Sequence, residues 1–191
     1  MKIGYLGPEG TFTHEAVIKH YPDEQHVPIL GIEECIKRLK EDSIDISILP
    51  KINSISNVDE LLIDRSLKII KTMHEKINMS IGGLDDFSEN KIICSKNYAL
   101  MQCTRFLSDY YDIEFDNGAK EFIEKLRSLR LIEETISTSK AMEDISKNHD
   151  LSRIAIGSKN GLLRYGLNVY LENINDKKRN ITTFVALRNK I

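Results

Sequence analysis

The chain has 191 residues, of which 41% are hydrophobic and 29% are charged, and its net charge is −2. That hydrophobic share can bury a core, which excludes an intrinsically disordered chain, and the lack of a basic excess argues against nucleic-acid binding. No apolar run approaches the roughly 18–20 residues of a membrane span, so we expect no membrane association. The three cysteines form no CxxC pair, which argues against a disulfide framework and favours the reducing cytoplasm.

Hydrophobic periodicity predicts an alternation of strands and helices along the chain. Apolar or alternating runs favour strands at residues 2–6, 27–30, 44–48, 66–75, 77–81, 91–94, 113–115, 131–135, 153–157, 169–174 and 182–187. One-sided apolar spacing favours helices at residues 13–20, 32–39, 58–62, 99–107, 119–126, 141–145 and 159–165. This alternation is typical of an α/β protein with mostly parallel sheets.

Polar loops follow several of the predicted strands, at the sheet edge where α/β proteins bind ligands. The loop at residues 7–15 has two glycines whose backbone N–H groups could approach a ligand, but Thr11 or Thr13 could equally cap the next helix. Asn53, after another strand, could close a turn or hold a hydroxyl or carboxylate. Both interpretations stay open for each loop.

Two further loops have hydroxyl side chains at a predicted helix start. Ser95 precedes one helix, with Gln102 about two turns along it, and Ser95 could be a helix cap or a ligand-binding residue. The Ser-Thr-Ser run at 137–139 could cap its helix or bind a carboxylate, because free N–H groups and the helix dipole meet there. The histidines have no metal-ligand spacing, and Cys94 is predicted to be an inert buried thiol, so we expect no metal site.

Five segments, in order along the chain, resemble the prephenate dehydratase family. They are residues 4–16, 95–103, 137–142, 154–167 and 180–184. The resemblance implies two α/β lobes like those of type II periplasmic-binding proteins, with the substrate in a cleft between them. It places residues 1–75 and 159–191 in one lobe and residues 76–158 in the other.

The resemblance also implies a reaction. Prephenate would lose its ring carboxylate as CO₂ and its ring hydroxyl as water, giving phenylpyruvate for phenylalanine biosynthesis without a metal or organic cofactor. Thr182 matches the family residue that assists the departing hydroxyl, and Asn53, Ser95 and Gln102 match its other catalytic residues. The substrate-binding positions that the resemblance implies are Glu9, Gly10, Thr11, Ser137, Thr138, Ser139, Asn180 and Phe184. A homodimer and the absence of the phenylalanine-sensing ACT domain are further expectations.

The chain departs from the family pattern at several of these positions. Ile52 stands in place of a carboxylate, Met79 in place of a histidine and Thr183 in place of an arginine. Because that arginine would pair with a substrate carboxylate, we expect Lys96 or Lys140 to supply the missing positive charge.

These departures leave two alternatives to a dehydratase. One is a prephenate decarboxylase of the same superfamily, which releases CO₂ without making the ring aromatic. The other is a carboxylate-binding protein without catalytic activity. Those decarboxylases lose the residues that match Thr182 and Asn53, and this chain keeps both, which favours dehydration.

Overall fold

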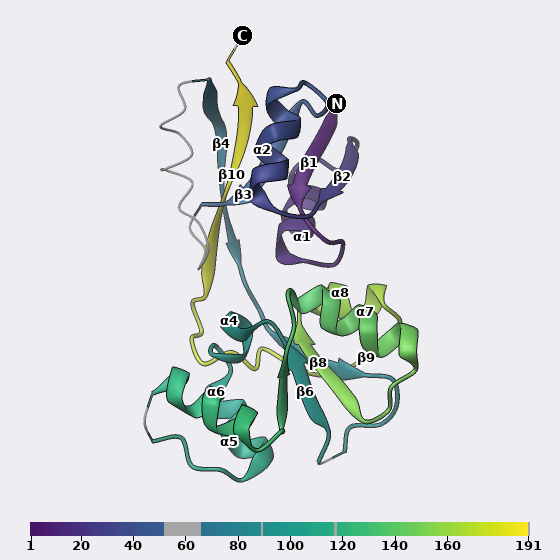
Figure 1. Cartoon of the computed structure of the whole chain (residues 1–191), viewed down its shortest axis with the longest axis vertical. Coiled ribbons are helices and arrows are strands. Elements are labelled where there is room, and N and C mark those ends of the chain that lie inside the picture. Colours follow the sequence, from purple (N-terminus) through teal and green to yellow (C-terminus); the bar gives the residue numbers. More distant parts are fainter. Residues whose placement is uncertain (52–65, 89, 117, 191) are drawn as a thin grey trace. The chain divides into compact units, whose positions relative to one another are not determined.

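The computed structural model describes residues 1–51, 66–88, 90–116 and 118–190 (Figure 1). The chain forms two compact units, one of Met1–Ile77 with Ile181–Ile191 and the other of Asn78–Asn180. The chain returns to the first unit at Ile181, and not at residue 159 as the resemblance implied. Residues 159–180 lie in the second unit because β9 (Asn168–Glu172) pairs there with β5 (Ser80–Gly83).

The first unit has a five-stranded sheet in the order β2-β1-β3-β10-β4. Its strands are β1 (Lys2–Leu6), β2 (Gln25–Ile29), β3 (Ile46–Pro50), β4 (Leu67–Lys76) and β10 (Ile181–Asn189). Strands β1, β2 and β3 are parallel, whereas β10 runs antiparallel to both β3 and β4. The prediction of mostly parallel sheets is thus wrong, since the last strand returns between two strands that run the other way.

Two helices, α1 (Phe12–His20) and α2 (Ile32–Lys40), belong to the first unit (Figure 1). Cys35 and Leu39 lie on the buried face of α2, four residues apart, as the apolar spacing predicts. Their core also includes Ile29, Ile44, Leu49, Leu67, Val185 and Leu187. Burying a side chain of this size contributes roughly 1.5–3 kcal/mol, so this core holds α2 and the closing strand β10 to the sheet.

The second unit has a sheet in the order β7-β6-β8-β5-β9. Its other strands are β6 (Ile92–Ser95), β7 (Ile132–Glu134) and β8 (Arg153–Gly157), which are parallel, and β5 is antiparallel to β8 and β9. Its helices are α4 (Asn97–Leu100), α5 (Thr104–Tyr111), α6 (Ala119–Ser128), α7 (Thr138–Asn148) and α8 (Lys159–Arg164). Gly157 lets α7 pack closely on β8, since a Cβ there would meet Met142 Cε at 1.9 Å.

Two predicted elements of the second unit differ in the structure. The single helix expected at residues 99–107 is divided into α4 and α5, which begins anew at Thr104. Residues 113–115 form no strand, and the sheet ends at β7, beside β6. The ring of Phe115 instead packs edge-on against Phe122 of α6, with 5.2 Å between the ring centroids.

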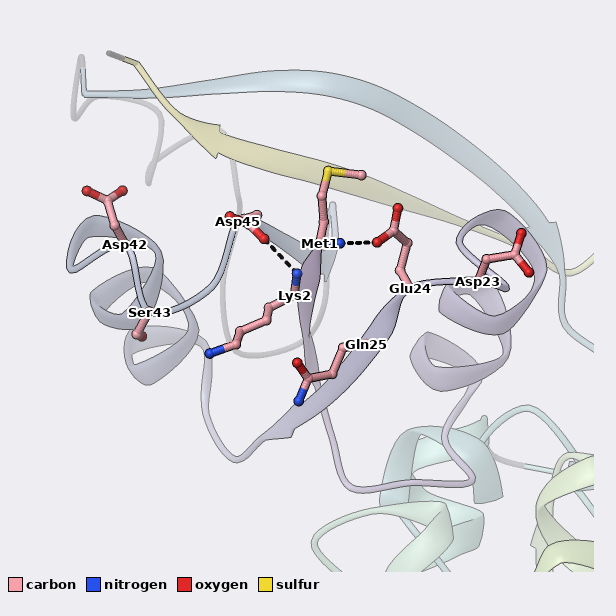
Figure 2. A pocket seen from close by; sticks show the side chains of 8 residues that line it. All are labelled: Met1, Lys2, Asp23, Glu24, Gln25, Asp42, Ser43 and Asp45. Atoms are coloured by element: carbon pink, nitrogen blue, oxygen red, sulfur yellow. Dashed lines mark hydrogen bonds and ion pairs between the residues drawn. The ribbon is translucent and has the colours of Figure 1, made fainter.

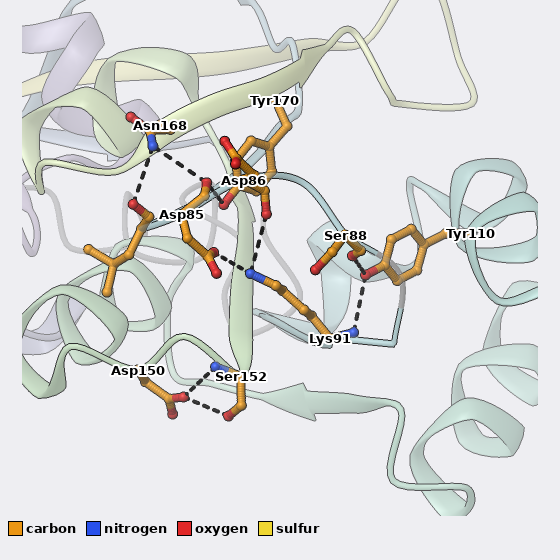
Figure 3. Close-up of polar contacts among 10 residues, drawn as sticks. Asp85, Asp86, Ser88, Lys91, Tyr110, Asp150, Ser152, Asn168 and Tyr170 are labelled. Carbon is orange, nitrogen blue, oxygen red and sulfur yellow. Dashed lines mark hydrogen bonds and ion pairs between the residues drawn. The ribbon is translucent and has the colours of Figure 1, made fainter.

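A buried lysine fastens the loop before β6 to its surroundings (Figure 3). The Lys91 ammonium pairs with the Asp85 carboxylate, and the Lys91 backbone N–H donates to the Tyr110 hydroxyl at 3.2 Å. The Tyr170 hydroxyl of β9 donates to the Asp85 carbonyl oxygen at 2.7 Å. Because a buried charge is tolerated only when it is paired, we interpret this network as structural.

The three cysteines are free and buried, as expected for core thiols. Burial, with a smaller contribution from Glu133, raises the pKa of the Cys94 thiol to about 12, so it is not a nucleophile at neutral pH. Within the described residues, no helix is both long enough and apolar enough to cross a membrane.

Candidate active site

The carboxyl ends of β1 and β3 meet at one edge of the first sheet, because these strands are parallel neighbours. Phe184 of β10 pairs with Pro50 at the end of β3. Thr182 therefore lies just beyond the end of β3, on the edge where β1 runs into the loop at residues 7–11. The structure thus brings two of the predicted site segments to the same edge of this unit.

In that loop, the side chain of Thr11 is engaged in the fold itself. Its Oγ1 accepts from the backbone N–H of His14 at 3.3 Å and donates to the Pro8 carbonyl at 3.0 Å, which makes Thr11 the cap of α1. Gly10 has a φ of +77°, and its N–H donates to His14 Nδ1 at 3.1 Å. The capping interpretation is confirmed for Thr11 rather than Thr13, and Glu9 beside it is half-buried.

Thr182 lies opposite Glu75 in the antiparallel pair of β10 and β4. Directly opposite residues project from the same face of the sheet, so the Thr182 hydroxyl and the Glu75 carboxylate are neighbours. Glu75 accepts from Lys19 Nζ and pairs with His20 Nε2, each at 2.6 Å. Burial disfavours the Glu75 carboxylate, but these hydrogen bonds outweigh it and keep the pKa of Glu75 below its ordinary value.

The next two residues of β10 have different surroundings. Thr183 Oγ1 lies 3.0 Å from His74 Nδ1, on the sheet face opposite to that of Thr182. The side chain of Phe184 is only 2% exposed, so it is a core residue. The structure therefore does not present Phe184 to a ligand, and it gives Thr183 a protein partner.

The carboxyl ends of β6, β7 and β8 meet in the same way in the second unit. Ser95, at the end of β6, is fully buried, and its Oγ donates to the Ile156 carbonyl of β8 at 2.7 Å. Its carbonyl accepts from the Thr135 N–H at 2.9 Å, just before α7 begins. Ser95 is thus not a helix cap, because Lys96 holds the N-cap position of α4.

The start of α7 combines a satisfied cap with unsatisfied donors. Ser137 Oγ accepts from the Lys140 N–H at 3.0 Å, which confirms the predicted cap. Among the described residues, the backbone N–H groups of Thr138 and Ser139 have no acceptor, and neither does the fully buried Ser139 hydroxyl. Free donors at a helix N-terminus attract an anion such as a carboxylate.

The two candidate cations differ in their pairing. Lys140 forms ion pairs with Glu143 at 3.0 Å and with Asp144 at 2.7 Å, and these hydrogen bonds raise the pKa of Lys140. Lys96 is half-buried, and its ammonium has no partner among the described residues. Of the two, Lys96 has the charge that remains available to a ligand.

Gln102 and Asn180 are hydrogen-bonded to each other, although 78 positions separate them in the chain. The side-chain N–H of Asn180 donates to Gln102 Oε1 at 2.6 Å. The Gln102 carbonyl oxygen is therefore occupied, and its NH₂ group has no acceptor in the described part of the chain. In this arrangement Gln102 offers donors to a ligand.

Some predicted positions lie outside the described residues, and some neighbours of the site have no sequence signal. Asn53 and Ile52 lie outside the described residues. Met79 is buried, and its backbone N–H donates to Asn175 Oδ1 at 3.1 Å within the fold. Sequence reasoning missed Glu75 and Asp176, because only strand register and a distant helix start reveal what they contact.

A separate depression of about 490 Å³ lies at the amino ends of β1 and β2 (Figure 2). It is lined by Met1, Lys2, Asp23, Glu24, Gln25, Asp42, Ser43 and Asp45. The terminal ammonium pairs with Glu24, and the Lys2 N–H donates to Asp45 at 2.6 Å. It contains none of the predicted site residues. Within the described chain, no group of three or more His, Cys, Asp or Glu side chains is arranged to hold a metal ion.

The fold and these strand-end donors define a two-lobed α/β protein of the type II periplasmic-binding-protein class. The family model described as "Prephenate dehydratase" matches residues 3–119 and 114–191. The chain belongs to the prephenate dehydratase family.

Curated relatives of the chain carry the same name. It is 30% identical over 196 residues to the "Bifunctional chorismate mutase/prephenate dehydratase" of Buchnera aphidicola subsp. Acyrthosiphon pisum, covering 97% of this chain and 46% of the relative. It is 27% identical to the "Prephenate dehydratase" of Bacillus subtilis, covering 98% of this chain and 64% of that one. The chain therefore spans about half to two thirds of these relatives' length.

A solved structure agrees with the fold. The prephenate dehydratase from Arthrobacter aurescens, solved in complex with L-Phe, matches the whole chain and 61% of its own, with a TM-score of 0.80 and 20% identity. The fold class that the resemblance implied is confirmed.

Proposed function

We propose that this protein is a prephenate dehydratase, which converts prephenate to phenylpyruvate with loss of CO₂ and water. The observation that carries the proposal is the family match from residue 3 to residue 191, which includes every segment with a candidate site residue. The free donors at the strand ends of each unit support it, because carboxylates and hydroxyls are groups that such donors bind.

The reaction needs donors more than it needs an acid–base pair. As the bond from the ring to its carboxylate breaks, the electron pair enters the ring, and the opposite C–O bond breaks with its pair leaving on the oxygen as hydroxide, which takes a proton from solvent to become water. Aromaticity of the product drives this fragmentation. The protein has to orient the dianion and stabilise the negative charge on the departing oxygen, which a preorganised donor does well.

Thr182 is the donor that we assign to the departing hydroxyl. Its hydroxyl has no hydrogen-bond partner among the described residues, whereas Thr183 is held by His74. A threonine hydroxyl is a weak acid, so we assign it a hydrogen bond to the leaving oxygen. In the second unit, the free NH₂ group of Gln102 supports the role of substrate donor that the family resemblance implies for that residue. The family resemblance supports Asn53 as a further catalytic residue.

The start of α7 and Lys96 are the groups that we assign to the two substrate carboxylates. The Thr138 and Ser139 N–H groups and the Ser139 hydroxyl would bind one carboxylate. Lys96 would pair with the other, in place of the arginine that Thr183 replaces. Ser95 supports this edge of the second unit through its bond to Ile156. In the first unit, Gly10 and Thr11 shape the loop that follows β1.

One assay tests the reaction. Prephenate is incubated with the protein, and proton NMR follows the ring signals against a sample without protein that corrects for spontaneous breakdown. Aromatic signals of phenylpyruvate support dehydration. Ring vinyl signals that survive while CO₂ is released would make the protein a non-aromatising decarboxylase, and unchanged prephenate would leave a binding protein.

We also propose a homodimer that works in the cytoplasm. The family resemblance supports the dimer, and three buried free thiols suit a reducing compartment. Light scattering of the purified protein tests the dimer, and a monomeric mass would refute it.

A further inference from the structure

Asp176 lies in the connection between β9 and β10 and binds the start of a helix that is distant in sequence. Its Oδ2 accepts from the Thr104 N–H at 3.0 Å and from Thr104 Oγ1 at 2.8 Å. Its Oδ1 accepts from the Arg105 N–H at 3.0 Å. A carboxylate at the first N–H groups of α5 is favoured by the helix dipole and by charge-assisted hydrogen bonds.

The same connection also holds Gln102 at both its backbone and its side chain. The Asp176 N–H donates to the Gln102 carbonyl at 2.7 Å, and the Asn180 side chain donates to Gln102 Oε1 at 2.6 Å. Gln102 is therefore clamped between residues 176 and 180 on one side and the start of α5 on the other.

The connection is itself tied down at its other end. The Ile174 N–H donates to the Met79 carbonyl at 3.0 Å, and Asn175 Oδ1 accepts from the Met79 N–H at 3.1 Å. Asn175 Nδ2 donates to the Lys177 carbonyl at 2.6 Å, which closes the turn. Asp176 thus projects from a turn that other hydrogen bonds already hold in place. Its carboxylate can therefore fix the position of the segment at residues 102–105.

We infer that Asp176 is a positioning residue for Gln102. It holds Gln102 so that the side-chain Oε1 accepts from Asn180 and the side-chain NH₂ group remains free to donate. This inference rests on the proposed function for its kinetic consequence, since Gln102 is there a donor to the reacting substrate. Without the Asp176 carboxylate, the backbone N–H groups of Thr104 and Arg105 lose their acceptor, so the segment that carries Gln102 is held less firmly against Asn180.

Asp176→Ala tests the inference, with Asp150→Ala as the matched control. Asp150 also accepts from the backbone N–H and the hydroxyl of Ser152, at 2.9 and 2.6 Å (Figure 3). It pairs with Arg153 in the same unit. Two readouts are compared: the side-chain NH₂ signals of Gln102 in nitrogen–proton NMR without substrate, assigned with Gln102→Glu, and the separate values of kcat and KM for prephenate.

We expect Asp176→Ala to shift the Gln102 NH₂ signals and to lower kcat roughly tenfold or more. Complete loss of one preorganised donor commonly lowers kcat by about 10²–10³-fold, and here the donor is only partly lost. Asp150→Ala should lower the melting temperature but change neither readout. Asp176→Glu, which keeps the charge, should recover part of kcat. If Asp176→Ala does not fold, Asp176→Asn, which keeps one acceptor, is measured in its place.

The inference would be overturned if the Gln102 NH₂ signals of the folded Asp176 variant matched those of the unmodified protein. Equal kcat values for the Asp176 variant and Asp150→Ala would also overturn it. The NMR signals need no turnover. An unmodified protein that does not convert prephenate would therefore refute the proposed function, while the signals still decide whether Asp176 positions Gln102.

Discussion

The side-chain amide of Asn180 donates to Gln102 Oε1 at 2.6 Å, and this bond determines which end of the Gln102 amide remains free. Asn180→Asp keeps the size of the side chain but removes its donors, so the Gln102 amide should turn and give its NH₂ to the new carboxylate. Its carbonyl would then face the ligand. We expect kcat for prephenate to fall roughly 10²-fold, as for a lost transition-state donor. Steady-state kinetics measure this, and an unchanged kcat would remove Gln102 from the donors.

Thr182→Ala should reduce turnover of prephenate by roughly 10²–10³-fold, the usual effect of losing one positioned donor. Its far-ultraviolet circular dichroism should match that of the parent. Thr183→Ala is the control, because it loses the contact with His74 on the other face of the strand and should keep most of the rate. A Thr182→Ala enzyme within threefold of the parent would contradict the dehydratase assignment.

Lys96→Met should raise KM for prephenate roughly tenfold or more, because a hydrogen bond to a charged group contributes about 1.5–3 kcal/mol. The methionine keeps the length of the side chain without its charge. Lys147→Met is the control, since Lys147 is 70% exposed and pairs with Glu143 near the end of α7. If the two variants have the same KM, Lys96 is a surface residue and neutral donors hold that carboxylate.

Ser139→Ala and Ser137→Ala should separate ligand binding from helix capping at the start of α7. The Ser139 hydroxyl has no partner among the described residues, so its removal should not lower the melting temperature but should raise KM. Ser137→Ala removes the cap to the Lys140 N–H and should cost about 1 kcal/mol of stability. Calorimetry and steady-state kinetics measure both effects, and a lower melting temperature for Ser139→Ala would assign its hydroxyl to the fold.

Glu75 should make the stability of the protein depend on pH. Its folded pKa is below the ordinary value, so its contribution is complete above the ordinary pKa and is lost as the pH falls through the folded pKa. Glu75→Gln should therefore lower the free energy of unfolding at pH 7 and flatten its decline below about pH 4.3, the ordinary glutamate pKa. Urea unfolding from pH 7 to pH 3 measures this. Glu33→Gln is the control, because the exposed Glu33 has no ion pair among the described residues, and equal pH profiles for the two variants would refute the prediction.

The sequence alone determined the features that depend on neighbours along the chain. The spacing of Cys35 and Leu39 predicts the helix face that the structure contains. The alternation at residues 44–48 predicts a strand buried on one face, and the structure has the strand two residues later, at Ile46–Pro50, with every residue buried. The hydroxyls at Thr11 and Ser137 precede their helices by one residue, so their caps follow from local sequence. The family motifs added the fold class, because their order along the chain is itself a sequence property.

Only the tertiary structure decided the relationships between distant residues. The place of β10 between β3 and β4 makes the first sheet mixed, and it puts Glu75 beside Thr182 through strand register. The bond of Asn180 to Gln102 and the cap that Asp176 gives to α5 join positions more than 70 residues apart. No periodicity records such pairs, because hydrogen bonding across a fold depends on where the backbones meet and not on spacing along the chain.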